Sequence, residues 1–253
     1  MKSKEKISII TAVFNGEAHI EDAIKSVQTQ TYPNIEHIII DGGSTDATLS
    51  IIAKYRGAYL RLLSEKDEGI YDAMNKGFAM ATGSIIGILH SDDVFENSEV
   101  IERVASAFGE QKCALVYGDL VYVDKSDTSK IIRYWKSGDF SAHRLSRGWM
   151  PPHPTLFCSS SYLHTKKFFN LSYLIAADYD LIQRLFSDTS VKYRYIPETL
   201  VRMRMGGTSN KNIRNLIRKT CEDYRAIRAN KTGGIFTLVC KNIRKIPQFF
   251  LRK

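Results

Sequence analysis

The sequence contains few of the residues that build disulfide-bonded or zinc-binding domains. Only four of its 253 residues are cysteine, and no two of these have the spacing of metal ligands. We therefore expect reduced thiols in a cytoplasmic protein. No apolar stretch reaches the roughly 18–20 residues that a membrane-spanning helix needs. The amino-terminal residues run directly into a strand pattern, so we expect no signal peptide.

Net charge is almost absent from most of the chain. The whole chain carries +9, and residues 211–253 hold 12 Lys/Arg and 2 Asp/Glu, which leaves −1 for the other 210 residues. Apolar side chains alternate with the basic ones in this tail, a composition that suits an anionic membrane surface. The alternative is a helix packed on the domain with a solvated basic face. No nucleic-acid-binding module is visible, so we expect no nucleic-acid partner.

The first hundred residues alternate between strand and helix patterns, which predicts a mostly parallel sheet with helices on both faces. Apolar residues at helical spacing predict the helices, and helix-breaking proline or glycine residues predict where they end. The expected strands are 7–13, 35–40, 60–63 and 85–89, and the expected helices are 17–30, a helix capped by Ser44 or Thr45 and ending near Tyr55, and 72–81.

The second half of the chain is richer in β patterns. A long strand over 114–123 and a hairpin partner over 131–135 are expected, followed by a proline-stiffened loop at 148–155. A helix at 177–186, a β segment at 192–205 and a basic helix at 212–229 come next. Gly233-Gly234 is a candidate hinge before a last amphipathic segment over 235–251, which Pro247 should kink.

Acidic residues follow two of the apolar strands. Asp92 and Asp93 come directly after 84–90, and Asp41 ends the strand that begins near residue 35. Neighbouring carboxylates at a buried strand end are costly unless a cation lies between them, and Mg²⁺ or Mn²⁺ would suit oxygen ligands. The alternative is a solvated turn or a helix cap. Asp41 is not needed for capping, so we expect it to be free for a ligand.

Four motifs occur in the order and spacing found in one enzyme family. They are Thr11-Ala-Val-Phe-Asn-Gly-Glu17, Asp41-Gly-Gly-Ser-Thr-Asp46, Asp67-x-Gly-x-x-Asp-Ala-x-Asn-x-Gly77 and Ser91-Asp-Asp93. In these motifs the chain resembles family 2 glycosyltransferases of the bacterial surface-polysaccharide type. The resemblance implies an α/β, GT-A-like nucleotide-binding fold, with a mostly parallel central sheet flanked by helices and a small β-hairpin region.

The resemblance also implies a division of the chain. Residues 1–210 would form the GT-A domain, with a nucleotide-sugar-binding half at 1–112 and an acceptor and catalytic half at 113–210. Residues 211–253 would form a basic, helical C-terminal extension.

A donor site is implied by the same motifs. Phe14 and Asn15 would line the base pocket, Asp41 would accept from the nucleobase, and Asp92 would face the ribose. Asp93 would bind Mn²⁺ or Mg²⁺ bridging the diphosphate, and Glu17 and Asp67 would complete the donor-binding set. Ser91 stands where the family often has a third acid, which suits an ion that arrives with its donor.

The second half would supply the catalytic base. Asp178 matches the aspartate of a Glu-Asp pair that serves as base in inverting members, although Ala177 replaces the glutamate. The alternative is an acid that complements the helix dipole. His153, Arg202 and Arg204 are candidates for acceptor or diphosphate contacts, with a loop histidine and surface arginines as the alternatives.

The resemblance therefore implies a metal-dependent, inverting transferase. It would move a hexosyl or N-acetylhexosaminyl group from a nucleoside diphosphate-sugar to a glycan or lipid-linked acceptor. We expect it to lie peripherally on the inner face of the plasma membrane. One alternative is a sugar nucleotidyltransferase, which should carry a Gly-rich basic loop where Thr11–Glu17 has no Lys or Arg. The other is a non-catalytic, membrane-associated scaffold that binds nucleotide-sugars.

Overall fold

The computed structural model describes residues 5–55, 57–111, 113–206, 213–244 and 248. Within these residues one sheet has the strand order β3-β2-β1-β4-β8-β6-β9-β5, and β7 pairs with β6 beside it. The strands are β1 (Ile7–Val13), β2 (Ile35–Asp41), β3 (Leu60–Ser64), β4 (Ile85–Ile88), β5 (Val94–Phe95), β6 (Leu115–Val123), β7 (Ile131–Trp135), β8 (Phe157–Ser159) and β9 (Tyr193–Arg204).

The first four strands run parallel, as the alternation of patterns predicts. β1 lies between β2 and β4, with Val13 opposite Asp41 and Ile10 opposite Ile88. Every residue of β1 is buried, because helices cover both faces of the sheet. The carboxyl ends of β1, β2 and β4 therefore lie at the same edge, where open α/β sheets bind ligands.

The second half continues the same sheet. β8 lies antiparallel between β4 and β6, and β6 pairs in parallel with β9. β6 and β7 form the expected hairpin, with Leu120 opposite Trp135. The sequence patterns did not predict β8 or β5.

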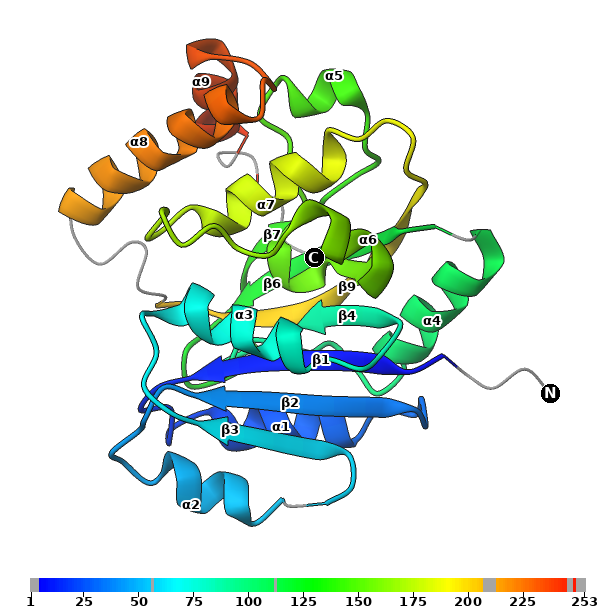
Figure 1. Ribbon diagram of the computed structural model, residues 1–253, viewed down its shortest axis with the longest axis vertical. Coiled ribbons are helices and arrows are strands. Elements are labelled where there is room, and N and C mark those ends of the chain that lie inside the picture. Colours follow the sequence, from blue (N-terminus) through cyan, green and yellow to red (C-terminus); the bar gives the residue numbers. More distant parts are fainter. Residues whose placement is uncertain (1–4, 56, 112, 207–212, 245–247, 249–253) are drawn as a thin grey trace.

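Helices cover the two faces of the sheet (Figure 1). Three of them pack on one face: α1 (Ile20–Gln28), α2 (Thr48–Ala53) and α4 (Val100–Gln111). On the other face lie α3 (Ile70–Met80), α6 (Ser160–Lys166) and α7 (Ala177–Phe186). α8 (Ile213–Ala229) and α9 (Ile235–Ile243) form a further layer beyond α7, at the top of Figure 1. The sequence patterns did not predict α4, α6, the short helix α5 (Ala142–Leu145) or the 3-10 turn η1 (His153–Thr155).

Two local expectations are wrong. The first helix begins at Ile20 rather than at residue 17. α2 begins at Thr48 after Ala47, and neither Ser44 nor Thr45 caps it. Ser44 instead accepts a hydrogen bond from another loop, described below. The expected kink at Pro247 lies outside the described residues.

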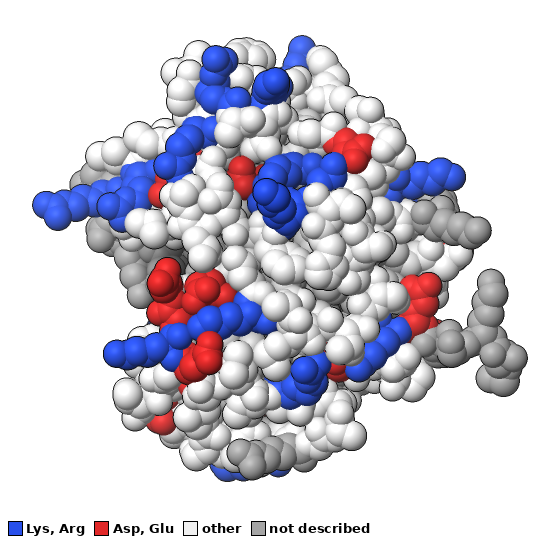
Figure 2. Space-filling model, viewed as in Figure 1, with Lys and Arg blue, Asp and Glu red and all other residues white. Residues whose placement is uncertain are grey.

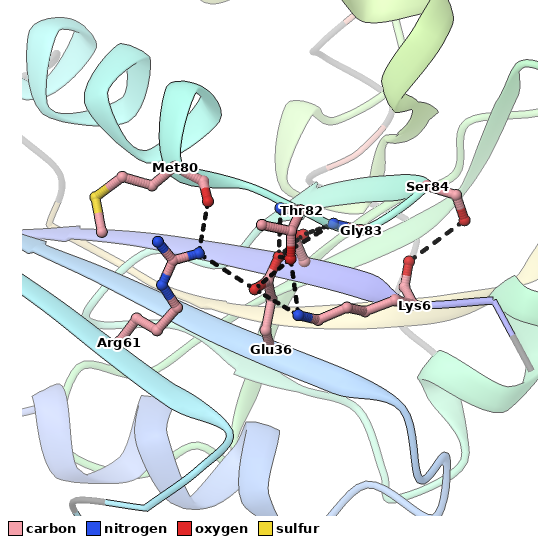
Figure 3. A network of polar contacts seen from close by, with 8 residues as sticks. Lys6, Glu36, Arg61, Met80, Thr82, Gly83 and Ser84 are labelled. Atoms are coloured by element: carbon pink, nitrogen blue, oxygen red, sulfur yellow. Dashed lines mark hydrogen bonds and ion pairs between the residues drawn. The ribbon is translucent and has the colours of Figure 1, made fainter.

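A buried carboxylate fastens the opposite, amino-terminal edge of the sheet (Figure 3). Glu36 is 2% exposed and pairs with Lys6 at 2.9 Å and with Arg61 at 3.5 Å. It also accepts hydrogen bonds from Ser8 and from the turn at Thr82 and Gly83 that precedes β4. One side chain thus ties the starts of β1, β2 and β4 together.

Candidate active site

The loop after β1 is clamped to the loop after β2. Asn15 has a positive φ of 50°, a conformation that asparagine tolerates better than most residues. Its backbone N–H donates to Ser44 Oγ at 2.8 Å, and its Oδ1 accepts from the Thr45 N–H at 2.9 Å. Phe14 is 63% exposed beside this clamp and is available for contact with a flat ligand.

Asp41 is engaged by its own turn. Its carboxylate accepts from the N–H groups of Gly43 and Ser44 at 3.1 Å and from Ser64 Oγ at 2.7 Å, and the residue is fully buried. Asp41 does not cap α2, as expected, but the expectation that its carboxylate is free of protein partners is wrong. A contact with a nucleobase stays a prediction.

Two further acids of the expected donor set also support loops. Glu17 accepts from the Ala47 N–H at 2.8 Å and so satisfies the start of α2. Asp67 accepts from the Gly69 N–H at 2.8 Å. A Cβ at Gly42 would lie 2.4 Å from Asp67 Oδ2, so only glycine lets the loops after β2 and β3 come this close. Figure 2 shows acidic side chains gathered near the start of α3, which follows Asp67.

Asp93 is a buried acid at this edge whose carboxylate has few hydrogen-bond donors around it. It is fully buried, its Oδ1 accepts from the Arg204 N–H at 3.2 Å, and its Oδ2 has no hydrogen-bond partner. Burial raises the pKa of Asp93 well above its usual range, and the charge of Asp92 adds to the effect. A buried carboxylate oxygen without a partner, next to a second acid, suits a bound cation.

The protein alone offers few ligands for such an ion. Among the described residues, no group of three or more His, Cys, Asp or Glu is arranged to hold a metal. Arg204 is 6% exposed and lies beside the pair, donating to the Asp92 carbonyl at 2.6 Å and pairing with Asp22 at 2.6 Å. The residues therefore fit a divalent ion whose remaining ligands come from a diphosphate and water, as is usual for Mg²⁺.

Asp178, at the start of α7, lies in a chain of polar contacts. His153 Nδ1 is 3.2 Å from Asp178 Oδ2, and His153 Nε2 is 2.6 Å from His90 Nε2. Tyr71 Oη donates to the Ile175 carbonyl at 2.7 Å and lies 3.3 Å from Asp178 Oδ1. Four segments that are far apart in sequence thus meet at one carboxylate.

The protonation of this cluster follows from its surroundings. Burial raises the pKa of Asp178, but His153, Lys241 and Lys219 outweigh it, so the pKa lies below the usual value. Burial lowers the pKa of His153, and it lowers that of His90 to about 3. The arrangement therefore consists of an ionised carboxylate and two neutral imidazoles at pH 7.

The carboxyl edge of the sheet joins these parts into one site. Tyr122, on β6, has a raised pKa, first because of burial and then because of the charges of Asp93 and Asp178. His90 and Asp93 also belong to one tight turn after β4, where the Asp93 N–H donates to the His90 carbonyl at 3.1 Å. Asp92 and Asp93 therefore lie on the same side of the molecule as Asp178 on α7.

Comparison with known proteins identifies the chain. The sequence model of glycosyl transferase family 2 matches residues 8–167. This chain belongs to glycosyl transferase family 2. A PGL/p-HBAD biosynthesis glycosyltransferase from Mycobacterium bovis is 32% identical over 208 residues, which are 80% of this chain and 78% of that protein. An uncharacterised glycosyltransferase from Mycobacterium tuberculosis is 33% identical over 191 residues, 73% of this chain.

Solved structures share the fold. TarS 1-349 from S. aureus matches with a TM-score of 0.69 at 18% identity, over 89% of this chain and 64% of that one. A mannosyltransferase from Pyrobaculum calidifontis, in complex with GDP-Man and Mn²⁺, matches with a TM-score of 0.64 at 15% identity over 98% of this chain. The chain thus spans less than two thirds of the length of TarS 1-349. The expected GT-A-like fold is confirmed.

In this glycosyltransferase the candidate Arg202 and the nearby acid Asp180 have partners of their own. Arg202 pairs with Glu96 at 2.8 Å and donates to the Thr128 carbonyl at 2.8 Å, which favours the structural interpretation of this arginine. Asp180, two residues after Asp178, is 4% exposed and accepts from Arg184 on its own helix at 2.9 Å. Neither side chain is directed to Asp93 or Asp178 by these contacts.

Sequence reasoning missed three contributors to the site of this transferase. Tyr71 stands inside the third motif, but no pattern indicated that it reaches residue 178. His90 directly precedes the motif Ser91-Asp-Asp93, but no pattern indicated its contact with His153. Glu222 on α8 accepts from the N–H groups of three consecutive residues before α7, at 2.8–3.1 Å: Leu174, Ile175 and Ala176. Contacts between residues so distant in sequence leave no local signal.

Proposed function

We propose that this glycosyltransferase moves a sugar, with inversion at the anomeric carbon, from a nucleoside diphosphate-sugar to a hydroxyl group of a glycan or lipid-linked acceptor. The observation that carries the proposal is the contact of Asp178 with His153, whose partner His90 belongs to the same turn as Asp92 and Asp93. One carboxylate to take a proton and one acidic turn to hold a diphosphate are the two parts that such a reaction needs.

Asp178 would act as the general base. The acceptor hydroxyl donates its proton to the carboxylate while its oxygen forms a bond to the anomeric carbon. The bond from that carbon to the diphosphate oxygen breaks on the opposite face, and the electron pair leaves with the nucleoside diphosphate. Tyr71 Oη donates its shorter hydrogen bond to the Ile175 carbonyl and contacts Asp178 Oδ1 only at 3.3 Å, so Oδ1 keeps a lone pair for the acceptor.

Asp93, with Asp92 beside it, would hold the divalent ion. Its unpartnered Oδ2 supports this role. When bound, Mn²⁺ or Mg²⁺ would supply Lewis-acid stabilisation of the departing diphosphate. Arg204 keeps this turn in place through the Asp92 carbonyl, so it would act on the diphosphate only indirectly.

The donor would be held by the loops after the first three strands. Phe14, exposed beside Asn15, would stack on the base, and the turn of Asp41 would face it. A hexosyl or N-acetylhexosaminyl group is the proposed cargo. TarS in complex with UDP-GlcNAc and the mannosyltransferase in complex with GDP-Man share the fold and support this range of donors.

Activity can be tested with a panel of nucleotide-sugars, with and without Mn²⁺. We expect metal-dependent turnover of one donor. Asp93→Ala and Asp178→Asn should each lower kcat by about 10²- to 10⁴-fold, because ion binding and proton transfer are lost. Asp127→Asn, in the exposed hairpin turn, is the matched control. Near-normal turnover in Asp178→Asn would contradict the assignment of the base, and no turnover of any donor would favour a binding scaffold.

The enzyme would reach a lipid-linked acceptor by docking on the cytoplasmic leaflet. No helix in the described part of the chain is long and apolar enough to cross a bilayer. The proposed surface is the outer face of α9, where large apolar side chains are 49–70% exposed at helical spacing: Ile235, Phe236, Val239 and Ile243. The opposite face of α9 is buried, with Lys241 in an ion pair with Asp223 at 2.6 Å.

The charges around this face support an anionic lipid surface. Glu222 and Asp223 are the acids between residues 213 and 244, and both are buried. Exposed basic side chains remain on α8 and the chain near α9: Arg214, Arg218, Arg225, Arg228, Lys231 and Arg244. Figure 2 shows lysine and arginine side chains over this upper part of the molecule. Basic groups around an apolar stripe favour interfacial binding.

Co-sedimentation with vesicles tests the docking face. Phe236→Ser with Val239→Ser should reduce binding to anionic vesicles severalfold, and so should Arg214→Glu with Arg228→Glu. Lys54→Glu, exposed beside α2 on the other side of the sheet, should leave binding unchanged. Equal binding of all variants, or no binding of the unaltered chain, would refute the membrane proposal.

A further inference from the structure

Two half-buried histidines stand behind the proposed base. His90 begins the turn after β4, and His153 begins η1. Their rings meet edge to face, with centroids 4.9 Å apart, and their Nε2 atoms are 2.6 Å apart. The second nitrogen of His153 faces Asp178.

The contacts permit only one arrangement of protons in the neutral pair. Asp178, whose pKa lies below its usual value, can only accept at pH 7, so a proton on His153 Nδ1 makes the 3.2 Å contact attractive and a bare Nδ1 makes it repulsive. A neutral His153 then has a bare Nε2, which can only accept. His90 Nε2 must therefore carry the proton of the 2.6 Å contact. The chain runs from His90 to His153 to Asp178, with each imidazole fixed in one tautomer.

The surroundings hold this chain in place. Apolar side chains line a small cavity against His153 and Asp178, including Phe78, Leu156 and Phe169. His153 is also flanked by prolines at 152 and 154, which stiffen its backbone.

We propose that His90 and His153 are positioning residues that fix the Asp178 carboxylate for proton abstraction. His153 binds Oδ2 and so leaves Oδ1 directed to the acceptor. His90 acts one step further away, by forcing His153 into the tautomer that donates to Asp178. The inference rests on the proposed role of Asp178 as the base.

Side-chain NMR of the full-length protein labelled at histidine tests the arrangement without any turnover. We expect His153 in the Nδ1–H tautomer and His90 in the Nε2–H tautomer. His90→Phe keeps the edge-to-face ring contact but removes the donor, so it should raise the fraction of His153 in the Nε2–H form. A wild-type His153 found in the Nε2–H form would overturn the proposal.

Kinetics provide the second readout. His153→Phe should lower kcat by about 10- to 100-fold, because a hydrogen bond to a charged group is lost. The KM for the donor should stay unchanged. The acid limb of the pH profile should move to higher pH, because His153 no longer lowers the pKa of Asp178. In His153→Asn the side-chain amide can take the place of Nδ1. Compared with His153→Phe, this variant should recover part of kcat, and its acid limb should return part of the way to the wild-type pH.

Controls separate this inference from the proposed function. His143→Asn, on the exposed surface of α5, should change neither kcat nor the pH profile. An unchanged pH profile and kcat in a folded His153→Phe variant would overturn the positioning role. Near-normal turnover in Asp178→Asn would refute the base itself, while the tautomer of His153 would still report the contact. If His153→Phe does not fold, His153→Asn and the wild-type tautomer decide the matter.

Discussion

At the scale of single residues, buried carboxylates differ in what neutralises them. Glu36 and Asp93 are both almost inaccessible to solvent. Glu36 is surrounded by two cations and several donors, and its pKa falls to about 2 although burial alone would raise it. Asp93 has one backbone donor, and burial raises its pKa. A fully satisfied acid indicates a structural role, and an unsatisfied one indicates a ligand.

Glu36→Gln should destabilise the fold in a pH-dependent way. The folded pKa of about 2 lies below the unfolded value of 4.5, so the charge of Glu36 stabilises the folded state above pH 4.5. This contribution, roughly 3 kcal/mol, should be lost as pH falls from 4.5 towards 2. Urea unfolding of wild type and variant at pH 7 and pH 3 measures it.

The matched control for this change is an exposed pair. Glu99→Gln removes the contact with Arg103 on the surface of α4, where Glu99 is 61% exposed, and should change the free energy of unfolding by less than about 1 kcal/mol. A stability difference for Glu36→Gln that is the same at both pH values would contradict the argument.

At the scale of elements, α8 supports the start of α7. Glu222 accepts from three consecutive backbone N–H groups that end two residues before Asp178. Asp180 accepts from Asn230 at 2.9 Å and so joins the two helices a second time. The sequence predicts α8 only as part of a basic C-terminal extension. In the structure α8 holds the start of α7, the helix that carries the proposed base.

Glu222→Ala should therefore affect both stability and catalysis. Three N–H groups lose their acceptor, which should cost roughly 3 kcal/mol of unfolding free energy. The backbone before Asp178 should loosen, so kcat should fall more than the donor affinity. Chemical denaturation and steady-state kinetics measure the two effects.

Glu110→Ala, exposed on α4, is the control for this element. Glu110→Ala should have the same free energy of unfolding and the same kcat as the wild type, within experimental error. A Glu222→Ala variant with wild-type kcat would show that α8 does not position the base.

At the scale of the whole molecule, the sequence predicted what is local. The apolar runs ending in Asp41 and Asp93 placed both acids at one edge of a parallel sheet, because strand direction follows from the β-α-β order. The motif containing Asp178 located the helix start. Tertiary packing brings Tyr71, His90 and Glu222 to that region. Such contacts produce no periodic pattern in the sequence, so they could not be predicted. The contacts of Asp41 with Gly43 and Ser44 are local and match the turn offered as the alternative, and only its contact with Ser64 depends on tertiary packing.

The meeting of four distant segments at Asp178 has a consequence for synthesis on the ribosome. The loops proposed to bind the donor all precede residue 95, and their β-α-β units can form while the rest of the chain is still being translated. The backbone before Asp178, the proposed base, gains its acceptor only after α8 has left the exit tunnel and Glu222 has engaged the connection between α6 and α7. A nascent or truncated polypeptide could thus capture a nucleotide-sugar before it is able to consume one.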